Sequence, residues 1–188
     1  KCMSLNSIEN LEKYSNIDSY AYSFEHCNSL TSITLPASAA VNSSTSIDFQ
    51  YAFMGCLSLT NLTGLAAYTN ASNFEHAFDG CDNLKSITLP PGSTATNVSF
   101  YAAFYGCSDL TNVVNFAAFT NVAQFYMTFS GCRSLRELIL PVTNTCNARA
   151  AQSFLDGYIC PRIVFPAGVP NYIVTDSEKQ TFSTGSVG

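Results

Sequence analysis

The sequence contains eight cysteine residues, whose side chains can take part in the widest range of chemistry, because thiols form disulfides, bind metals and act as nucleophiles. Five of them recur within one local pattern, Phe-x-x-Cys-x-x-Leu, and Cys2 fits the same register without the Phe. The five are Cys27, Cys56, Cys81, Cys107 and Cys132. A buried thiol packs as a small apolar side chain. We therefore expect this row to be free thiols in a core.

Other uses of the cysteines are less consistent with their positions. Row members on adjacent repeats would lie side by side with parallel Cα–Cβ bonds, which is poor disulfide geometry. Cys146 and Cys160 lie off the row, and whether they pair is left open. His26 and His76 occupy different repeat positions and no Cys-x-x-Cys pair is present, so we predict no metal site and no cofactor.

Catalytic signatures are also missing from the sequence. It contains no nucleophile elbow, phosphate-binding loop or metalloprotease motif. The acidic residues are scattered over predicted loops, as at Asp48, Asp79, Asp82 and Asp109. We therefore predict that the protein is not an enzyme, and we assign no catalytic residue.

The repeat itself has a nearly constant period. Its anchor positions are 2, 27, 56, 81, 107, 132 and 157, where Gly157 replaces the cysteine. A period in the twenties is typical of stacked coils that bury their apolar faces against one another. We predict about seven coils in one elongated domain, residues 1–165. The more polar segment 166–188 is expected to form a terminal cap and tail.

Two local patterns alternate within each coil. Phe100, Phe104, Cys107 and Leu110 are spaced by four, three and three residues, which predicts one face of a short helix. The pattern Ile-x-Leu-Pro, as in residues 87–90, predicts a short strand that the proline ends. The fold class predicted from these two patterns is therefore α/β, with a short helix and a short strand in each coil.

Coils of two kinds follow one another. Those that start at Cys27, Cys81 and Cys132 end their strand in Leu-Pro. The others keep an apolar residue at every third position and carry a Tyr/Phe-Ser/Thr-Asn segment. The true repeat is thus a pair of coils. The longest loop, Ala37 to Ser46, is expected to project from one rim.

Composition narrows the possible partners. About 47% of the residues are hydrophobic, 11% are charged and the net charge is −5, which argues against nucleic acid as a partner. No apolar run approaches the roughly 20 residues of a membrane span. Because the chain opens inside a repeat, we expect a targeting signal to lie outside it.

The pattern Phe-x-x-Cys-x-x-Leu-x-x-Ile-x-Leu-Pro at residues 24–36, 78–90 and 129–141 resembles the BspA-like leucine-rich repeat family. The resemblance implies a curved solenoid with a concave parallel sheet and convex helices. It also implies a cell-surface or secreted location and adhesion to host matrix proteins or to other cells. Such a family has no catalytic residues to assign. A parallel β-helix, whose coils have similar lengths, is the alternative architecture.

The candidate binding residues flank the buried residue of the last strands, since alternate strand residues face opposite sides. They are Asn112, Val114, Glu137, Ile139, Arg162 and Val164. At the strand position directly after the buried residue, the earlier coils carry hydroxyl side chains and the last three coils carry aliphatic ones, beside a Glu–Arg pair. An exposed aliphatic stripe of this kind is a candidate contact surface. The C-terminal segment could equally cover the stripe, or the row could be a β-propensity ladder on a solvated sheet.

The sequence thus predicts a non-enzymatic extracellular or cell-surface module that binds a host matrix or cell-surface protein or glycan. A structural spacer that displays another domain is the alternative. A carbohydrate-binding module would need clustered exposed aromatic residues, and the chain has no Trp. The aromatic residues Tyr101, Tyr105 and Tyr126, expected on the helical side, are predicted to pack between neighbouring coils.

Overall fold

The computed structural model describes residues 2–14, 17–36, 46–141 and 162–164 of the 188-residue chain. Several predictions concern residues outside these ranges. They include the pairing of Cys146 with Cys160, most of the loop after Pro36, and the cap and tail at 166–188.

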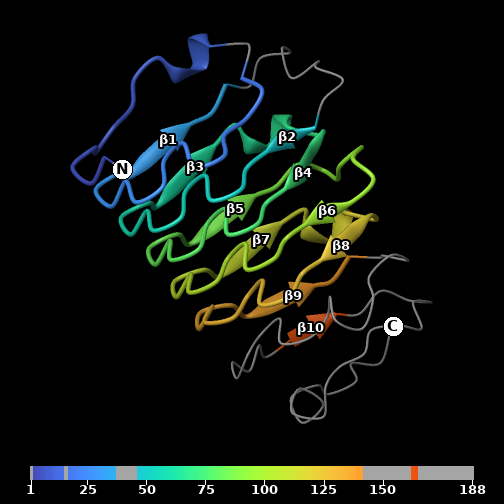
Figure 1. The fold of residues 1–188 in the computed structure, drawn as a ribbon. Coiled ribbons are helices and arrows are strands. Elements are labelled where there is room, and N and C mark those ends of the chain that lie inside the picture. The colour runs from blue at the N-terminus through green and yellow to red at the C-terminus, as the bar shows by residue number, and fades with distance from the viewer. Residues whose placement is uncertain (1, 15–16, 37–45, 142–161, 165–188) are drawn as a thin grey trace.

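Six short strands form one row along the stack, which we call the repeat-strand face (Figure 1). They are β1 (Ser32–Thr34), β3 (Asn61–Thr63), β5 (Ser86–Thr88), β7 (Asn112–Val114), β9 (Glu137–Ile139) and β10 (Arg162–Val164). All pairings are parallel, and they join the strands two by two as β1–β3, β5–β7 and β9–β10. This agrees with the sequence, in which the true repeat is a pair of coils.

A second row of strands runs along the stack beside the first (Figure 1). Its members are β2 (Ile47–Asp48), β4 (Ala71–Asn73), β6 (Val98–Ser99) and β8 (Val122–Gln124). They form one parallel four-stranded sheet in the order β2-β4-β6-β8. Each coil in this part of the chain therefore crosses from one row of strands to the other and back.

The prediction of a helix for the Phe-x-x-x-Phe-x-x-Cys segment is wrong. Residues 101–106 form consecutive hydrogen-bonded turns, and so do the equivalent segments 21–26, 50–55, 75–80 and 126–131. The N–H of Phe104 bonds to the carbonyl of Thr128 on the next coil at 2.9 Å, while Cys107 closes a turn onto Phe104 at 3.1 Å. Neighbouring coils thus accept the hydrogen bonds that a helix would make internally, and the left-handed residues Ala102 and Gly106 interrupt any helical turn.

The described helices are three single 3-10 turns on alternate coils. They are η1 (Leu11–Lys13), η2 (Leu65–Ala67) and η3 (Phe116–Ala118). Each follows a residue with positive φ, namely Asn10, Gly64 or Asn115. The apolar residues at every third position match the three residues per turn of this helix.

The core consists of rows of identical or similar side chains that run along the stack. Phe24, Phe53, Phe78, Phe104 and Phe129 stack in series, with ring centroids 5.2 to 5.4 Å apart. The four residues predicted to share one face, Phe100, Phe104, Cys107 and Leu110, are all fully buried. The sequence therefore identified the buried residues of this segment correctly, although not its backbone conformation.

The predicted thiol row is confirmed. The row consists of buried thiols that form no disulfide, namely Cys27, Cys56, Cys81, Cys107 and Cys132. Cys2, in the first coil, is also free but exposed.

Candidate binding surface

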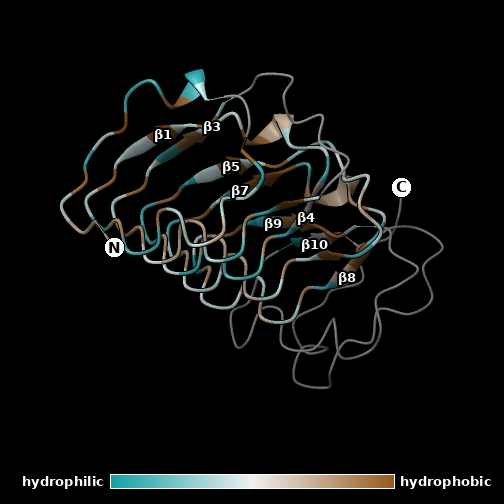
Figure 2. Cartoon of the chain, turned by 45° about the horizontal axis from the view of Figure 1, so that its top comes forward, coloured by the Kyte–Doolittle hydropathy of each residue, from teal (hydrophilic) through white to brown (hydrophobic). Residues whose placement is uncertain are grey.

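The repeat-strand face changes character along the stack. Both outward positions of β1, β3 and β5 carry exposed Ser, Thr or Asn side chains. Thr63 donates a hydrogen bond to the hydroxyl of Thr34 at 3.0 Å, so neighbouring side chains in this part of the face bond to one another. The aliphatic residues that follow are 39% exposed at Val114 and 49% exposed at Ile139. Figure 2 shows this change in the brown ends of the later strands.

Strands β9 and β10 bring four of the six candidate residues together. Their register places Arg162 opposite Glu137 and Val164 opposite Ile139. The guanidinium Nη1 of Arg162 lies 2.6 Å from Oε1 of Glu137. The predicted charged pair is therefore formed, and it lies next to an aliphatic pair on the same two strands.

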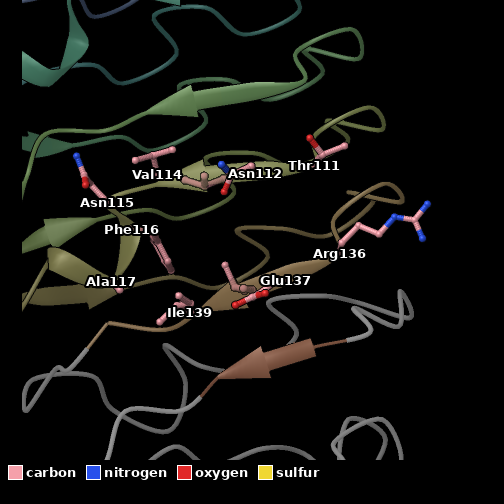
Figure 3. Close-up of a pocket in the computed structure, with 11 residues that line it drawn as sticks. Thr111, Asn112, Val114, Asn115, Phe116, Ala117, Arg136, Glu137 and Ile139 are labelled. Carbon is pink, nitrogen blue, oxygen red and sulfur yellow. The ribbon is translucent and has the colours of Figure 1, made fainter.

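The other two candidates, Asn112 and Val114, lie across a groove from this group. Strand β7 pairs with β5, and β9 pairs with β10, so β7 and β9 belong to different sheets. Between them is a groove of about 530 Å³, which we call the β7/β9 groove. Figure 3 shows Val114 and Asn112 on one border, Ile139 and Glu137 on the other, and Arg136 extending away. The expected aliphatic stripe is thus divided after Val114.

The depth of the groove follows from one inward residue. The inward positions Ile33, Leu62, Ile87 and Leu138 are between 2% and 6% exposed. The equivalent residue of β7 is Val113, which is shorter than leucine and remains half-buried. Because Val113 does not fill its position, the groove reaches into the apolar interior.

The other residues that line the β7/β9 groove were not predicted from the sequence. They are Thr111, Val113, Asn115, Phe116, Ala117, Arg136 and Leu138. Two signals in the sequence point to them: the alternation of coil types, which pairs the strands two by two, and the valine at an inward position elsewhere held by Leu or Ile. Asn115 contributes a turn at the end of β7 and donates its amide to the carbonyl of Leu89 at 2.9 Å.

A row of aromatic side chains lies along the stacked turns. Tyr22, Tyr51, His76, Tyr101 and Tyr126 follow one another, with ring centroids 4.8 to 5.6 Å apart. Most of these contacts are face-to-face, so the rings pack against neighbours as predicted for Tyr101 and Tyr126. Tyr105 is 40% exposed and has no place in this row. A row whose ring faces are covered is a poor platform for stacking sugars.

One pair of titratable side chains lies at this row. Nδ1 of His76 lies 2.7 Å from Oδ2 of Asp79. Burial raises the pKa of the Asp79 carboxyl, and the hydrogen bond to His76 partly opposes that effect. Among the described residues, no three His, Cys, Asp or Glu side chains gather as metal ligands.

Comparison with known families agrees with the repeat architecture. A profile described as BspA type leucine-rich repeat region matches six copies, over residues 1–123 and 45–169. The chain belongs to this family. BspA-type repeats are often involved in surface binding, are typically non-enzymatic, and are commonly found in surface or secreted bacterial proteins. No match was found among curated proteins.

A solved structure has the same fold as this BspA-type chain. It is the crystal structure of a leucine-rich repeat protein from Bacteroides ovatus ATCC 8483, with a TM-score of 0.54 and 22% sequence identity. The match covers 76% of this chain and 32% of that protein, so this chain spans about a third of its length. In the described part of the BspA-type chain, no helix has the length and apolar character needed to cross a membrane.

Proposed function

We propose that this chain is a non-enzymatic recognition module of a cell-surface or secreted protein, and that it binds a protein or glycan through its repeat-strand face. The observation that carries the proposal is the pair of exposed aliphatic residues, Val114 and Ile139, on the two borders of the β7/β9 groove. Apolar side chains exposed together beside a concave site are typical of contact surfaces.

The charged pair supports the same location. Glu137 and Arg162 lie on the neighbouring strands and are both exposed, so they can meet charged groups of a partner. Such rim charges fix the orientation and the association rate of a complex more than its strength. Each strand of this face is also held by hydrogen bonds to its partner in the pair, which limits the entropy that the surface loses on binding.

The test is the triple variant V114S/I139S/V164S on arrays of host matrix proteins and glycans. Full burial of each aliphatic side chain would contribute about 1.5–3 kcal/mol, so retention on the arrays should be lost. Circular dichroism and Tm should change little, because Val114 and Ile139 are exposed in the free protein. The matched control is T34A/T63A/T88A, which alters the same strand position in the polar half of the face.

Two results would count against the proposal. Retention that survives the aliphatic triple variant but fails in the threonine variant would place the site in the polar half. A wild-type protein that binds no matrix protein or glycan would favour the structural spacer instead.

A further inference from the structure

The repeat-strand face is interrupted at two places where the row of strands beside it is continuous. Strand β3 is not paired with β5, and β7 is not paired with β9. In the second row the same coils are joined, the first two by the pairing of β2 with β4 and the other two by the pairing of β6 with β8. We call the β3/β5 and β7/β9 junctions the two breaks of the repeat-strand face (Figure 1).

Backbone hydrogen bonds just before the strands follow the same alternation. The N–H of Thr60 donates to the carbonyl of Thr31 at 2.9 Å, and the N–H of Thr111 donates to the carbonyl of Lys85 at 2.9 Å. The equivalent amides at the breaks belong to Lys85 and Arg136. Within the described part of the chain, neither donates to the preceding coil. The breaks therefore extend beyond the strands themselves.

The stacked turns, in contrast, are bonded across both breaks. At the β3/β5 junction the N–H of Gly55 donates to the carbonyl of Asp79 at 2.7 Å. At the β7/β9 junction the N–H of Phe104 donates to the carbonyl of Thr128 at 2.9 Å. Neighbouring coils are thus held at the turns and in the second row, and they lack a ladder only along the repeat-strand face. Elements bonded along one side alone can rotate about that side as a hinge.

The packing beneath the face is looser at the breaks. The inward residues of the strands that precede them are Leu62 on β3, which is 6% exposed, and Val113 on β7, which is half-buried. The inward residues of β1, β5 and β9 are only 2% to 3% exposed, namely Ile33, Ile87 and Leu138. Fewer packing contacts lower the free energy that is needed to separate neighbouring coils.

We propose that the solenoid flexes at these two breaks, with each strand pair moving as a rigid unit. The units are β1–β3, β5–β7 and β9–β10. The repeat-strand face opens and closes between them, while the turns and the second row act as the pivot. Hinge motions of this collective kind occur in microseconds to milliseconds. The inference concerns the free protein and is independent of what the face binds.

The experiment measures distances between two spin labels in the full chain by double electron–electron resonance. The pair T34C/I139C spans four coil junctions on the repeat-strand face, from β1 to β9, and includes both breaks. The matched pair S19C/Q124C spans four junctions along the second row, because Ser19 extends that sheet by a bridge to Asp48. All four labelled positions are exposed. A strand spacing of about 4.8 Å places each pair about 20 Å apart, within the range of the method.

Labelling is confined to the introduced cysteines. The cysteines outside the buried row, Cys2, Cys146 and Cys160, are replaced by serine in both proteins. The distance distribution of T34C/I139C should be about twofold or more wider than that of S19C/Q124C, because hinge motion displaces the unbonded side most. Equal widths, or a wider distribution in the second row, would overturn the inference.

Two variants change the packing at the breaks in opposite directions. Val113→Leu gives β7 the inward residue found on β3 and should narrow the T34C/I139C distribution. Leu62→Val removes a methylene at the other break and should widen it. The control Ile33→Val removes a methylene beneath the β1–β3 pair and should leave the width unchanged.

Circular dichroism and Tm establish that each variant is folded. The two break variants act at separate junctions, so either one decides the matter if the other misfolds. The inference is wrong if the folded break variants leave the width unchanged, or if Ile33→Val widens the distribution as much as Leu62→Val does.

Discussion

The Sγ of Cys81 donates a hydrogen bond to the carbonyl oxygen of Phe53 on the preceding coil, over a distance of 3.2 Å. That same carbonyl accepts the backbone N–H of Cys56 at 3.1 Å. Equivalent bonds run from Cys56 to Phe24, from Cys107 to Phe78 and from Cys132 to Phe104, at 3.0 to 3.1 Å. The thiol row therefore links successive coils as well as filling the core, which explains why a residue with a weak donor recurs there.

Replacing one thiol of the row should weaken the stack. Cys81→Ala removes the bond to Phe53 and leaves a small void, but the carbonyl keeps its bond to Cys56. We expect a loss of about 1–2 kcal/mol in the free energy of unfolding, measured by urea titration. Cys2→Ala, at the exposed member of the register, should change stability very little. Equal effects at the two positions would contradict the linking role.

The buried thiols should also make stability fall at alkaline pH. Burial raises the pKa of Cys56 to about 12 and raises the pKa values of Cys81 and Cys107 well above their usual range. In the unfolded chain a thiol ionises from about pH 8.5. The unfolded state then binds fewer protons than the folded state, so stability is intact below that pH and is lost as pH rises toward the folded values.

The alkaline loss is measured by urea titrations at pH 7 and pH 10 in the presence of reductant. Each thiol can contribute up to about 1.4 kcal/mol per pH unit within the window. Burial raises the pKa of the Tyr20 and Tyr68 phenols too, so they add to the loss as pH passes 10. Cys81→Ala should lose less stability between the two pH values than the wild type does. An identical loss would show that the thiols do not cause it.

The Phe row should carry more stability than the neighbouring exposed aromatic residues. Phe104 is fully buried, and its ring stacks on Phe78 and Phe129 with centroids 5.4 Å away on each side. Phe104→Ala should therefore cost about 3–5 kcal/mol. Tyr105→Ala, one residue further and 40% exposed, should cost much less. Both values come from denaturant titration, and similar values would mean that the buried face of this segment is misassigned.

How far the sequence predicts this molecule depends on the kind of interaction. Periodicity located Phe104 and Cys107 in the core, because burial repeats with the coil whatever the backbone does. It predicted a helix at that segment because spacings of four and three fit one, and the bond from Phe104 to Thr128 on the next coil is invisible in the local pattern. The charged pair of Glu137 and Arg162 followed from register alone. The β7/β9 groove did not, because it depends on which strands pair.

The turn after β3 should tolerate no side chain. Gly64 has a φ of +87°, and a Cβ at this residue would lie 2.2 Å from the carbonyl oxygen of Leu35. Gly64→Ala should cost at least about 1–2 kcal/mol for the left-handed backbone, with the contact adding to it. Asn115 holds the equivalent turn after β7 at φ 69°, so Asn115→Gly should lose only about 1 kcal/mol with its hydrogen bond to Leu89. A melting experiment that ranks the two variants in the opposite order would contradict this assignment.

The pair of Glu137 and Arg162 should matter more for recognition than for stability. Their side chains are 43% and 66% exposed, and surface ion pairs of this kind contribute about 0–1 kcal/mol to folding. Glu137→Gln and Arg162→Gln should therefore each shift Tm very little. Each should nevertheless slow association with the matrix protein or glycan retained on the arrays, since rim charges act mainly on the encounter rate.

The exchanged variant E137R/R162E separates the two roles. It restores an ion pair between β9 and β10, but it presents the two charges in reversed positions to anything that approaches the face. If the pair orients a partner, the exchanged protein should melt like the wild type and still associate more slowly, as measured by surface plasmon resonance at low salt. If exchange restores the wild-type association rate, the pair serves the strand pairing alone and the orientation role is wrong.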